Sequence, residues 1–139
     1  MRIAHLYPDL LNLYGDRGNI MCLQYRCRQR GIQVTIDEIS VGDPFDHTKY
    51  DLLFIGGGQD FEQEVLLEDL HRGKDEEIRR AVADGTVVLA ICGGYQMLGK
   101  YYQTYTGERL DYIGAVDSTP WAKKSGSLAI TPLIRNSVE

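Results

Sequence analysis

The chain has 139 residues, the size of one ordinary domain, and 43% of them are apolar, which is enough for a buried core. Acidic residues outnumber basic ones by 20 to 15, and the resulting net charge of −5 argues against nucleic-acid binding through a basic face. Because no apolar run approaches the roughly 20 residues of a membrane helix and the first residues lack a secretory signal, we expect a cytoplasmic protein without membrane insertion.

The first third of the chain predicts two strands with a helix between them. Residues 2–7 are typical of a short strand, which a Pro-Asp pair ends. A helix is expected from Asn19, as its N-terminal cap, to about Arg30, and Gly31 supplies the left-handed residue that ends it. The β-branched, alternating residues 33–39 predict the second strand.

Cys22 and Cys27 lie within this expected helix, five positions apart. Side chains at that spacing point in different directions, so the two thiols cannot form a bridge. An odd number of cysteines, without Cys-x-x-C or Cys–His spacing, favours neither a disulfide framework nor a zinc site. We therefore expect no bound metal.

The middle of the chain contains an apolar run that ends in three glycines. Residues 50–55 are almost continuously apolar, as in a parallel strand covered on both faces, and they lead into Gly56-Gly57-Gly58. Helices are then expected over about residues 61–70 and 74–83.

A second apolar run follows. Residues 86–91 repeat the buried-strand pattern and continue directly into Cys92-Gly93-Gly94. A short helix is expected after these glycines, to Leu98, and residues 101–117 are expected to be mostly extended.

Strands that alternate with helices predict an α/β protein with a parallel sheet. In such a sheet the loops after Tyr7, Ile55 and Ile91 lie at the same, carboxyl edge. We expect one domain over residues 1–117, incomplete at its C-terminal end, and a divergent tail over residues 118–139.

Cys92 has the sequence surroundings of a nucleophile. It stands between an apolar strand and the start of a helix, with small residues two positions before and two after, as a sharp strand-to-helix elbow requires. The helix start would favour the thiolate, and the amide of Gly93 could donate to a developing oxyanion. The alternative is a small buried residue at a strand end; the elbow pattern favours the nucleophile.

The turn Gly56-Gly57-Gly58 follows the neighbouring strand at the same edge. A tight glycine turn can aim backbone amides outward, so this turn could supply a second oxyanion donor beside Cys92. Neither Gly-Lys-Ser/Thr nor Gly-x-Gly-x-x-Gly is present, and a nucleotide phosphate loop is not expected. A plain tight connection between strand and helix is an equal alternative on the local sequence.

Three separated stretches resemble one family. Ile91-Cys-Gly-Gly-Tyr-Gln-Met-Leu-Gly99 resembles the nucleophile motif of class I (triad) glutamine amidotransferases, in their cobyric-acid-synthase-like branch. The resemblance narrows to the glutaminase subunits of lipid II isoglutaminyl synthases, the GatD type, through Tyr7-Pro-Asp-Leu-Leu-Asn-Leu-Tyr-Gly-Asp-Arg-Gly-Asn-Ile20 and Phe54-Ile-Gly-Gly-Gly-Gln-Asp-Phe-Glu-Gln63. It implies a flavodoxin-like three-layer sandwich whose C-terminal part is missing.

The resemblance also implies a reaction. Cys92 would attack the side-chain amide of glutamine and give a thioester and ammonia, without a cofactor. Backbone amides of Gly58 and Gly93 would form the oxyanion hole, and Gln96 and Gly57 would bind the substrate; otherwise Gln96 would be an exposed polar helix residue. A synthetase subunit resembling a Mur ligase would use the ammonia to amidate the D-glutamate of lipid II.

Cysteine attack needs a general base, which in this family is a histidine from a strand well beyond the nucleophile. This chain has only His5, His47 and His71, all before Cys92. We expect His5 to be a hydrogen-bonded core residue, and His47 and His71 to be solvated. None matches the position of the base, so we expect the chain alone to be inactive.

Two other functions stay open at this point. A cobyrinate- or cobyrate-type amidotransferase would carry the same cysteine elbow. A shortened, non-catalytic module could instead bind and stabilise a ligase partner. The chain itself would then be either a fragment or altered form of a full glutaminase, or a natural short form.

Overall fold

The computed structural model describes residues 1–12, 15–58, 60–103, 107, 109–117, 121–122 and 128–129, and the side chains of all these except residues 60–64, 121–122 and 128–129. By its internal contacts the chain divides into two compact units, Met1–Tyr95 and Gln96–Glu139. Within the described part, none of the helices is long and apolar enough to cross a bilayer.

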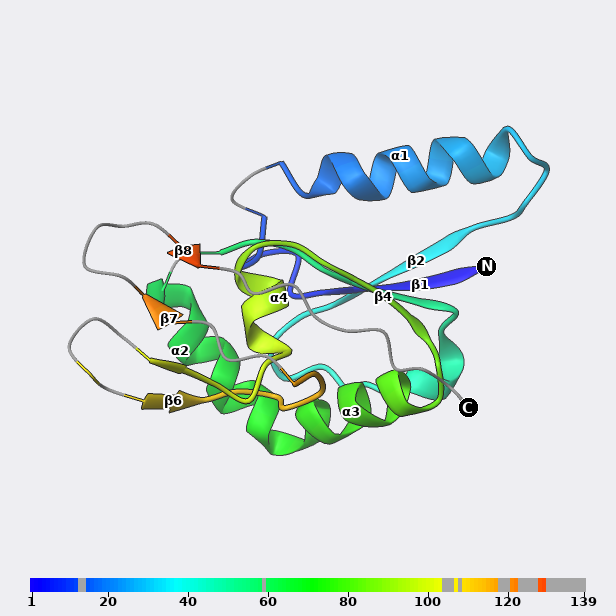
Figure 1. Cartoon of the computed structure of the whole chain (residues 1–139). Coiled ribbons are helices and arrows are strands. Elements are labelled where there is room, and N and C mark those ends of the chain that lie inside the picture. Colours follow the sequence, from blue (N-terminus) through cyan, green and yellow to red (C-terminus); the bar gives the residue numbers. More distant parts are fainter. Residues whose placement is uncertain are drawn as a thin grey trace, which may run out of the picture. The chain divides into compact units, whose positions relative to one another are not determined.

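The first unit is built on a four-stranded parallel sheet with the strand order β2-β1-β3-β4. Figure 1 shows α1 on one side of this sheet and α2 and α3 on the other. The order of the strands and the placement of helices on both sides of the sheet therefore confirm the expected α/β fold. The elements are β1 (Arg2–Leu6), α1 (Arg17–Arg28), β2 (Thr35–Ile39), β3 (Leu52–Ile55), α2 (Asp60–Asp69), α3 (Asp75–Ala83) and β4 (Val87–Ala90).

The core lies around the two inner strands. Ile3 of β1 and Phe54 of β3 pack with Ile20 of α1 in one buried cluster. Because successive side chains of a strand point to opposite faces, His5 shares the face of Ile3 that is turned toward α1. The strands of this sheet begin and end within two residues of the positions that the sequence predicted.

Helix α1 begins at Arg17, two residues before the expected cap Asn19. Asp16 occupies the capping position but makes no side-chain bond to the helix. The reason is that its carboxylate accepts the N–H of Gly57 instead. The end of the helix is as predicted, since Gly31 follows it with a left-handed φ of +69°.

The two helices after β3 are also confirmed, but they are not separate. A π-helical turn, Leu70–Lys74, joins α2 to α3, and Gly73 within it has a φ of +122°. Only glycine adopts such a φ without strain, so this residue allows the change of direction. A short 3-10 helix, η1 (His47–Lys49), precedes β3.

Strand β4 differs from the prediction of a strand covered on both faces. It is an edge strand among the described residues, and Val87 is 59% exposed. Strand β3, with the same apolar pattern, is buried from Leu53 to Ile55. The apolar run predicted a parallel strand correctly, but its position in the sheet depends on which neighbours it has, and the run itself does not encode them.

The second unit contains short strands, β5 (Tyr101–Gln103), β6 (Arg109–Asp111), β7 (Trp121–Ala122) and β8 (Leu128–Ala129), in the order β6-β5-β7-β8. Strands β5 and β6 pair antiparallel, and Tyr102 and Tyr112 stack with ring centroids 6.0 Å apart. The extended conformation expected over residues 101–117 is confirmed at residues 101–103 and 109–111, and residues 104–106 and 108 lie outside the described residues. Most of residues 118–139 lie outside the described residues, so the boundary expected at residue 117 stays a prediction.

Candidate active site

Cys92 stands on a sharp turn between β4 and the short helix α4 (Gly93–Met97). Its φ is +49°, and Tyr7 is the one other non-glycine residue with a positive φ among the described residues. The left-handed region is strained for a residue with a Cβ, and such residues concentrate at functional sites. The side chain is exposed, so the alternative of a buried structural thiol is wrong.

Gly94 locks this elbow onto the neighbouring strand. Its N–H donates to the carbonyl of Gly56 at 3.1 Å and to that of Ile91 at 2.9 Å. A Cβ at Gly94 would lie only 2.5 Å from the Gly56 oxygen and 2.7 Å from the Ile55 oxygen. The elbow therefore needs a residue without a side chain two positions after the cysteine, as the sequence pattern indicated.

The glycine turn after β3 is held from the other side. A Cβ at Gly56 would overlap the carbonyl oxygen of Leu11 and lie 3.0 Å from Cγ of Asp16. The N–H of Gly57 donates to the Asp16 carboxylate at 3.2 Å, and Asp16 is buried. The loop before α1 thus fixes the turn in one conformation.

Asp16 is a supporting residue that the sequence did not predict. An aspartate just before a helix is typical of an N-terminal cap, and that local signal hid its contact with Gly57, 41 positions along the chain. The only hint was its place inside the first of the family-like stretches.

The remaining predicted site residues fall on these two turns or close behind them. Gly58 is half-buried in the turn after β3, and Gly93 is buried in the first turn of α4. The amide of Gly57 is already bonded to the carboxylate of Asp16. Gln96 belongs to the second unit and is buried, so it is not an exposed helix residue.

The first histidine differs partly from its prediction. His5 is buried, with its ring 5.1 Å from that of Phe54 in an edge arrangement. However, Nε2 has no hydrogen-bond partner among the described residues, so His5 is not a fully bonded core residue. Burial lowers its pKa, because the charged imidazolium is poorly solvated there; Arg17 lowers it further, and Glu38, Asp16 and Asp9 oppose the shift.

His47 is buried, and its prediction as a solvated loop residue is wrong. Nδ1 lies 2.8 Å from a carboxylate oxygen of Glu77, and Nε2 lies 2.9 Å from one of Asp84. These two carboxylates raise the pKa of His47, the bond to Glu77 first and that to Asp84 second. Because η1 precedes β3, this histidine lies at the amino edge of the sheet, opposite the Cys92 turn.

The same cluster has the ligand types of a metal site. One ligand atom each of Asp46, His47 and Glu77 lies within 4.8 Å of the others. Both ring nitrogens of His47 already have carboxylate partners, Glu77 and Asp84. His71, by contrast, is exposed as predicted and pairs with Asp75, at 3.4 Å.

Together these features define a class: an α/β protein with a cysteine on a strand-to-helix elbow at the carboxyl edge of a parallel sheet. Residues 2–125 match the model of the CobB/CobQ-like glutamine amidotransferase domain. The chain therefore belongs to this family of glutamine amidotransferases, and the resemblance noted in the sequence is confirmed.

Curated relatives narrow the comparison. The chain is 47% identical over 116 residues to "Lipid II isoglutaminyl synthase (glutamine-hydrolyzing) subunit GatD" of Streptococcus pneumoniae, a match that covers 84% of this chain and 44% of that protein. The protein of the same name from Staphylococcus aureus is 41% identical over 117 residues, covering 84% and 48%. The chain thus spans about half the length of these relatives.

Two further matches are more limited. A "Probable cobyric acid synthase" of Methanopyrus kandleri is 54% identical over 46 residues, which is 32% of this chain and 9% of that protein. Among solved structures, a putative peptidase E of Listeria monocytogenes is similar in fold, with a TM-score of 0.51 and 17% identity over 72% of this chain and 50% of that one.

Proposed function

We propose that this chain carries the nucleophile half of a glutaminase that supplies ammonia for the amidation of lipid II. The observation that supports it most directly is the exposed Cys92 at a φ of +49°, on an elbow bonded through Gly94 to the neighbouring glycine turn. A rigid, strained turn that presents a thiol to solvent is what a cysteine nucleophile requires.

The chemistry follows from this geometry. The thiolate of Cys92 adds to the amide carbon of the glutamine side chain and forms a tetrahedral oxyanion, which the amides of Gly58 and Gly93 stabilise. Collapse of this intermediate breaks the C–N bond, and the nitrogen leaves as ammonia after it gains a proton. Water then hydrolyses the thioester to glutamate. Gly57, in the turn after β3, binds the substrate, and the family match assigns Gln96 a substrate-binding role as well.

The acceptor is the D-glutamate of lipid II, and the partner is a Mur-ligase-like synthetase subunit in the cytoplasm. Two relatives whose matches each cover 84% of this chain are named as a subunit of lipid II isoglutaminyl synthase, which supports lipid II as the acceptor and a second subunit as the partner. Two matches to cobyric acid synthases cover only 32% and 50% of the chain, so the cobyrinate-type alternative is less favoured. Free cysteines are consistent with a reducing compartment.

The general base is not among the residues we assign. His47 is held between two carboxylates at the opposite edge of the sheet, and His71 is exposed in the turn between α2 and α3. His5 has a lowered pKa, but it lies on β1, and β3 separates that strand from β4. We therefore expect little glutamine turnover by this chain alone.

The test adds imidazole to the solution as a general base. The chain is incubated with glutamine and hydroxylamine, which converts a γ-glutamyl thioester to the hydroxamate, with and without added imidazole. We expect imidazole to accelerate hydroxamate formation in the wild type and in Cys22→Ala, but not in Cys92→Ala. Equal rates in wild type and Cys92→Ala would contradict the proposal. Fast Cys92-dependent turnover without imidazole would instead show that one of the three histidines acts as the base.

A further inference from the structure

Helix α1 has an outward face that is unusual for a solvent-exposed helix. Met21 is 66% exposed and Tyr25 is 64% exposed, and Cys22 beside them is also exposed. Residues four and seven positions apart fall on one side of a helix, so Met21, Tyr25 and Arg28 form a continuous row. A helix that packs one face on a core normally has polar residues on the other face. We call this row the α1 ridge.

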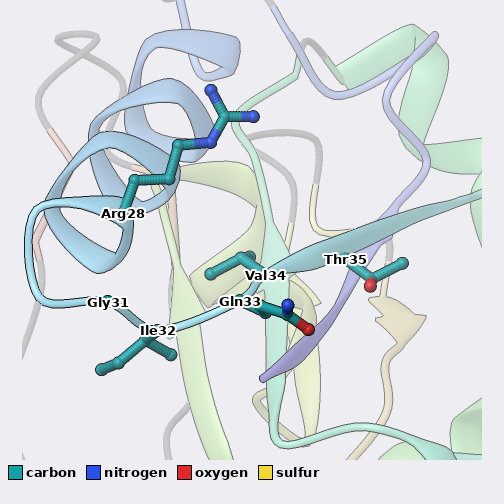
Figure 2. A pocket seen from close by; sticks show the side chains of 6 residues that line it. All are labelled: Arg28, Gly31, Ile32, Gln33, Val34 and Thr35. Carbon is teal, nitrogen blue, oxygen red and sulfur yellow. The ribbon is translucent and has the colours of Figure 1, made fainter.

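The ridge continues into a shallow hollow of about 490 Å³ at the end of the helix. Figure 2 shows the side chains that line it: Arg28 comes from the last turn of α1, and the others come from the connection into β2 and from its first residue. Ile32, in this connection, is 43% exposed. The hollow is therefore a place where an apolar side chain of a partner can contact Ile32 while a carboxylate approaches Arg28.

The charge of this region is opposite to that of the whole chain. Arg17, Arg26, Arg28 and Arg30 lie in or just after α1, and no acidic residue occurs from residue 17 to residue 36, although the net charge of the chain is −5. Within the described residues, none of these four side chains forms an ion pair with a carboxylate; Arg30 donates to the carbonyl of Arg26 at 3.0 Å. The arginine side chains are thus available to carboxylates of another molecule.

The composition of this surface favours a protein, rather than a membrane, as the binding partner. Tyr, Met and Arg are the residues enriched in protein–protein contacts, where arginine pairs with carboxylates at the rim. A helix that lies on a bilayer needs a broad face of Trp, Phe or Leu, whereas the ridge consists of Met21, Tyr25 and Arg28, with Cys22 beside it.

We infer that the α1 ridge and the adjoining hollow form the surface on which the synthetase subunit docks, through an apolar patch surrounded by carboxylates. This inference rests on the proposed function for the identity of the partner. Tyr25 and Arg28 are its main contacts, because one supplies a large rigid apolar surface and the other lies where ridge and hollow meet.

The experiment measures binding of the full chain to the purified Mur-ligase-like synthetase by calorimetry. We expect Tyr25→Ala and Arg28→Glu each to weaken binding by about tenfold or more. Val65→Ala and Arg72→Glu are matched controls, since Val65 is another exposed apolar residue and Arg72 an exposed arginine on other helical segments, and they should leave the affinity nearly unchanged. Higher salt should weaken wild-type binding.

A second measurement of the same docking requires no substitution in the α1 ridge. Maleimide labelling of Cys22 in a Cys92→Ala background should slow when the synthetase is added, because Cys22 lies beside the ridge. Unaltered labelling together with unaltered affinity of the two variants would overturn the docking surface. Failure of the wild type to bind the synthetase would also overturn it, as would tighter binding to phosphatidylglycerol vesicles or self-association that the ridge variants abolish. Imidazole-stimulated hydroxamate formation in the same sample shows whether the glutaminase proposal survives.

Discussion

Two strands of the sheet, β1 and β4, are each followed by a residue in the same strained backbone conformation. The side chain of one of these residues is buried, and that of the other is exposed. Tyr7 follows β1 with a φ of +53°, and Cys92 comes shortly after β4 with a φ of +49°. Both lie at the carboxyl edge of the parallel sheet. Tyr7 is almost completely buried, whereas Cys92 is exposed.

The side chain of Tyr7 is fixed by a buried ion pair. Its hydroxyl donates to Asp69 at 2.7 Å, and the ammonium of Lys74 lies 2.6 Å from the same carboxylate and 4.8 Å from the centre of the Tyr7 ring. Burial alone would raise the pKa of Asp69, but the bonds from Lys74, Tyr7 and the amide of Gly42 lower it on balance. Burial and the neighbouring carboxylate raise the pKa of Tyr7.

At Cys92 the backbone is fixed but the side chain is not. The bonds of Gly94 and the close approach to Gly56 hold the turn, and the thiol itself is left to solvent. A left-handed residue therefore has two uses in one sheet. At Tyr7 tertiary contacts offset the strain and stabilise the fold, whereas at Cys92 the strained turn leaves the proposed nucleophile exposed to solvent.

The largest effect should come from breaking the ion pair on the Tyr7 side. Lys74→Met leaves Asp69 buried without its cation, and we expect the free energy of unfolding to fall by about 3–5 kcal/mol. Chemical denaturation measures the change. Adding Asp69→Asn to Lys74→Met should recover part of the loss, and a loss below about 1 kcal/mol for the single variant would contradict the account.

The next effect tests the Cys92 side. Gly94→Ala forces a Cβ against the carbonyls of Gly56 and Ile55, and we expect a loss of about 3 kcal/mol together with slower reaction of Cys92. Gly18→Ala is the matched control, because a Cβ at Gly18, in the first turn of α1, would meet no atom within 4 Å. That variant should be neutral or stabilising by about 0.5–1 kcal/mol, and equal destabilisation by both would refute the role of Gly94.

Asp16 should have a smaller effect that is specific to the glycine turn. Asp16→Ala removes the acceptor of the Gly57 amide, and we expect a loss of about 1–2 kcal/mol and faster hydrogen exchange of that amide. Asp16→Asn keeps an oxygen acceptor and should retain most of the protection. Unchanged exchange of the Gly57 amide in Asp16→Ala would show that other contacts hold the turn.

The smallest effect lies away from both strand ends, at His47. Its pKa is raised in the folded state by Glu77 and Asp84, so its contribution to stability is complete below the unfolded value of 6.5 and is lost as the pH rises through the folded value. We expect the difference in unfolding free energy between wild type and His47→Gln to shrink by less than about 1 kcal/mol from acidic to alkaline pH. A difference that grows with pH would reverse the sign and contradict the assignment.

Features that depend on residues close together in the chain were predicted from the sequence, whereas features that depend on distant residues were missed. The elbow at Cys92, the glycine turn after β3 and the end of α1 were predictable, because glycine and apolar patterns act within a few residues. The buried environment of His47 and the role of Asp16 were not, since their partners lie 30 and 41 positions away. The edge position of β4 was missed for the same reason, because only its tertiary neighbours decide it.

The central claim is that Cys92 is a nucleophile prepared by its turn, and Cys22 is an exposed thiol of the same molecule that is not. The most direct test compares their rates of labelling by a glutamine-derived chloromethyl ketone, resolved by peptide mass spectrometry. We predict that Cys92 reacts on the order of a hundredfold faster than Cys22, and that iodoacetamide shows a much smaller preference. Equal labelling of the two thiols by the ketone, or an inert Cys92 at alkaline pH, would contradict the account.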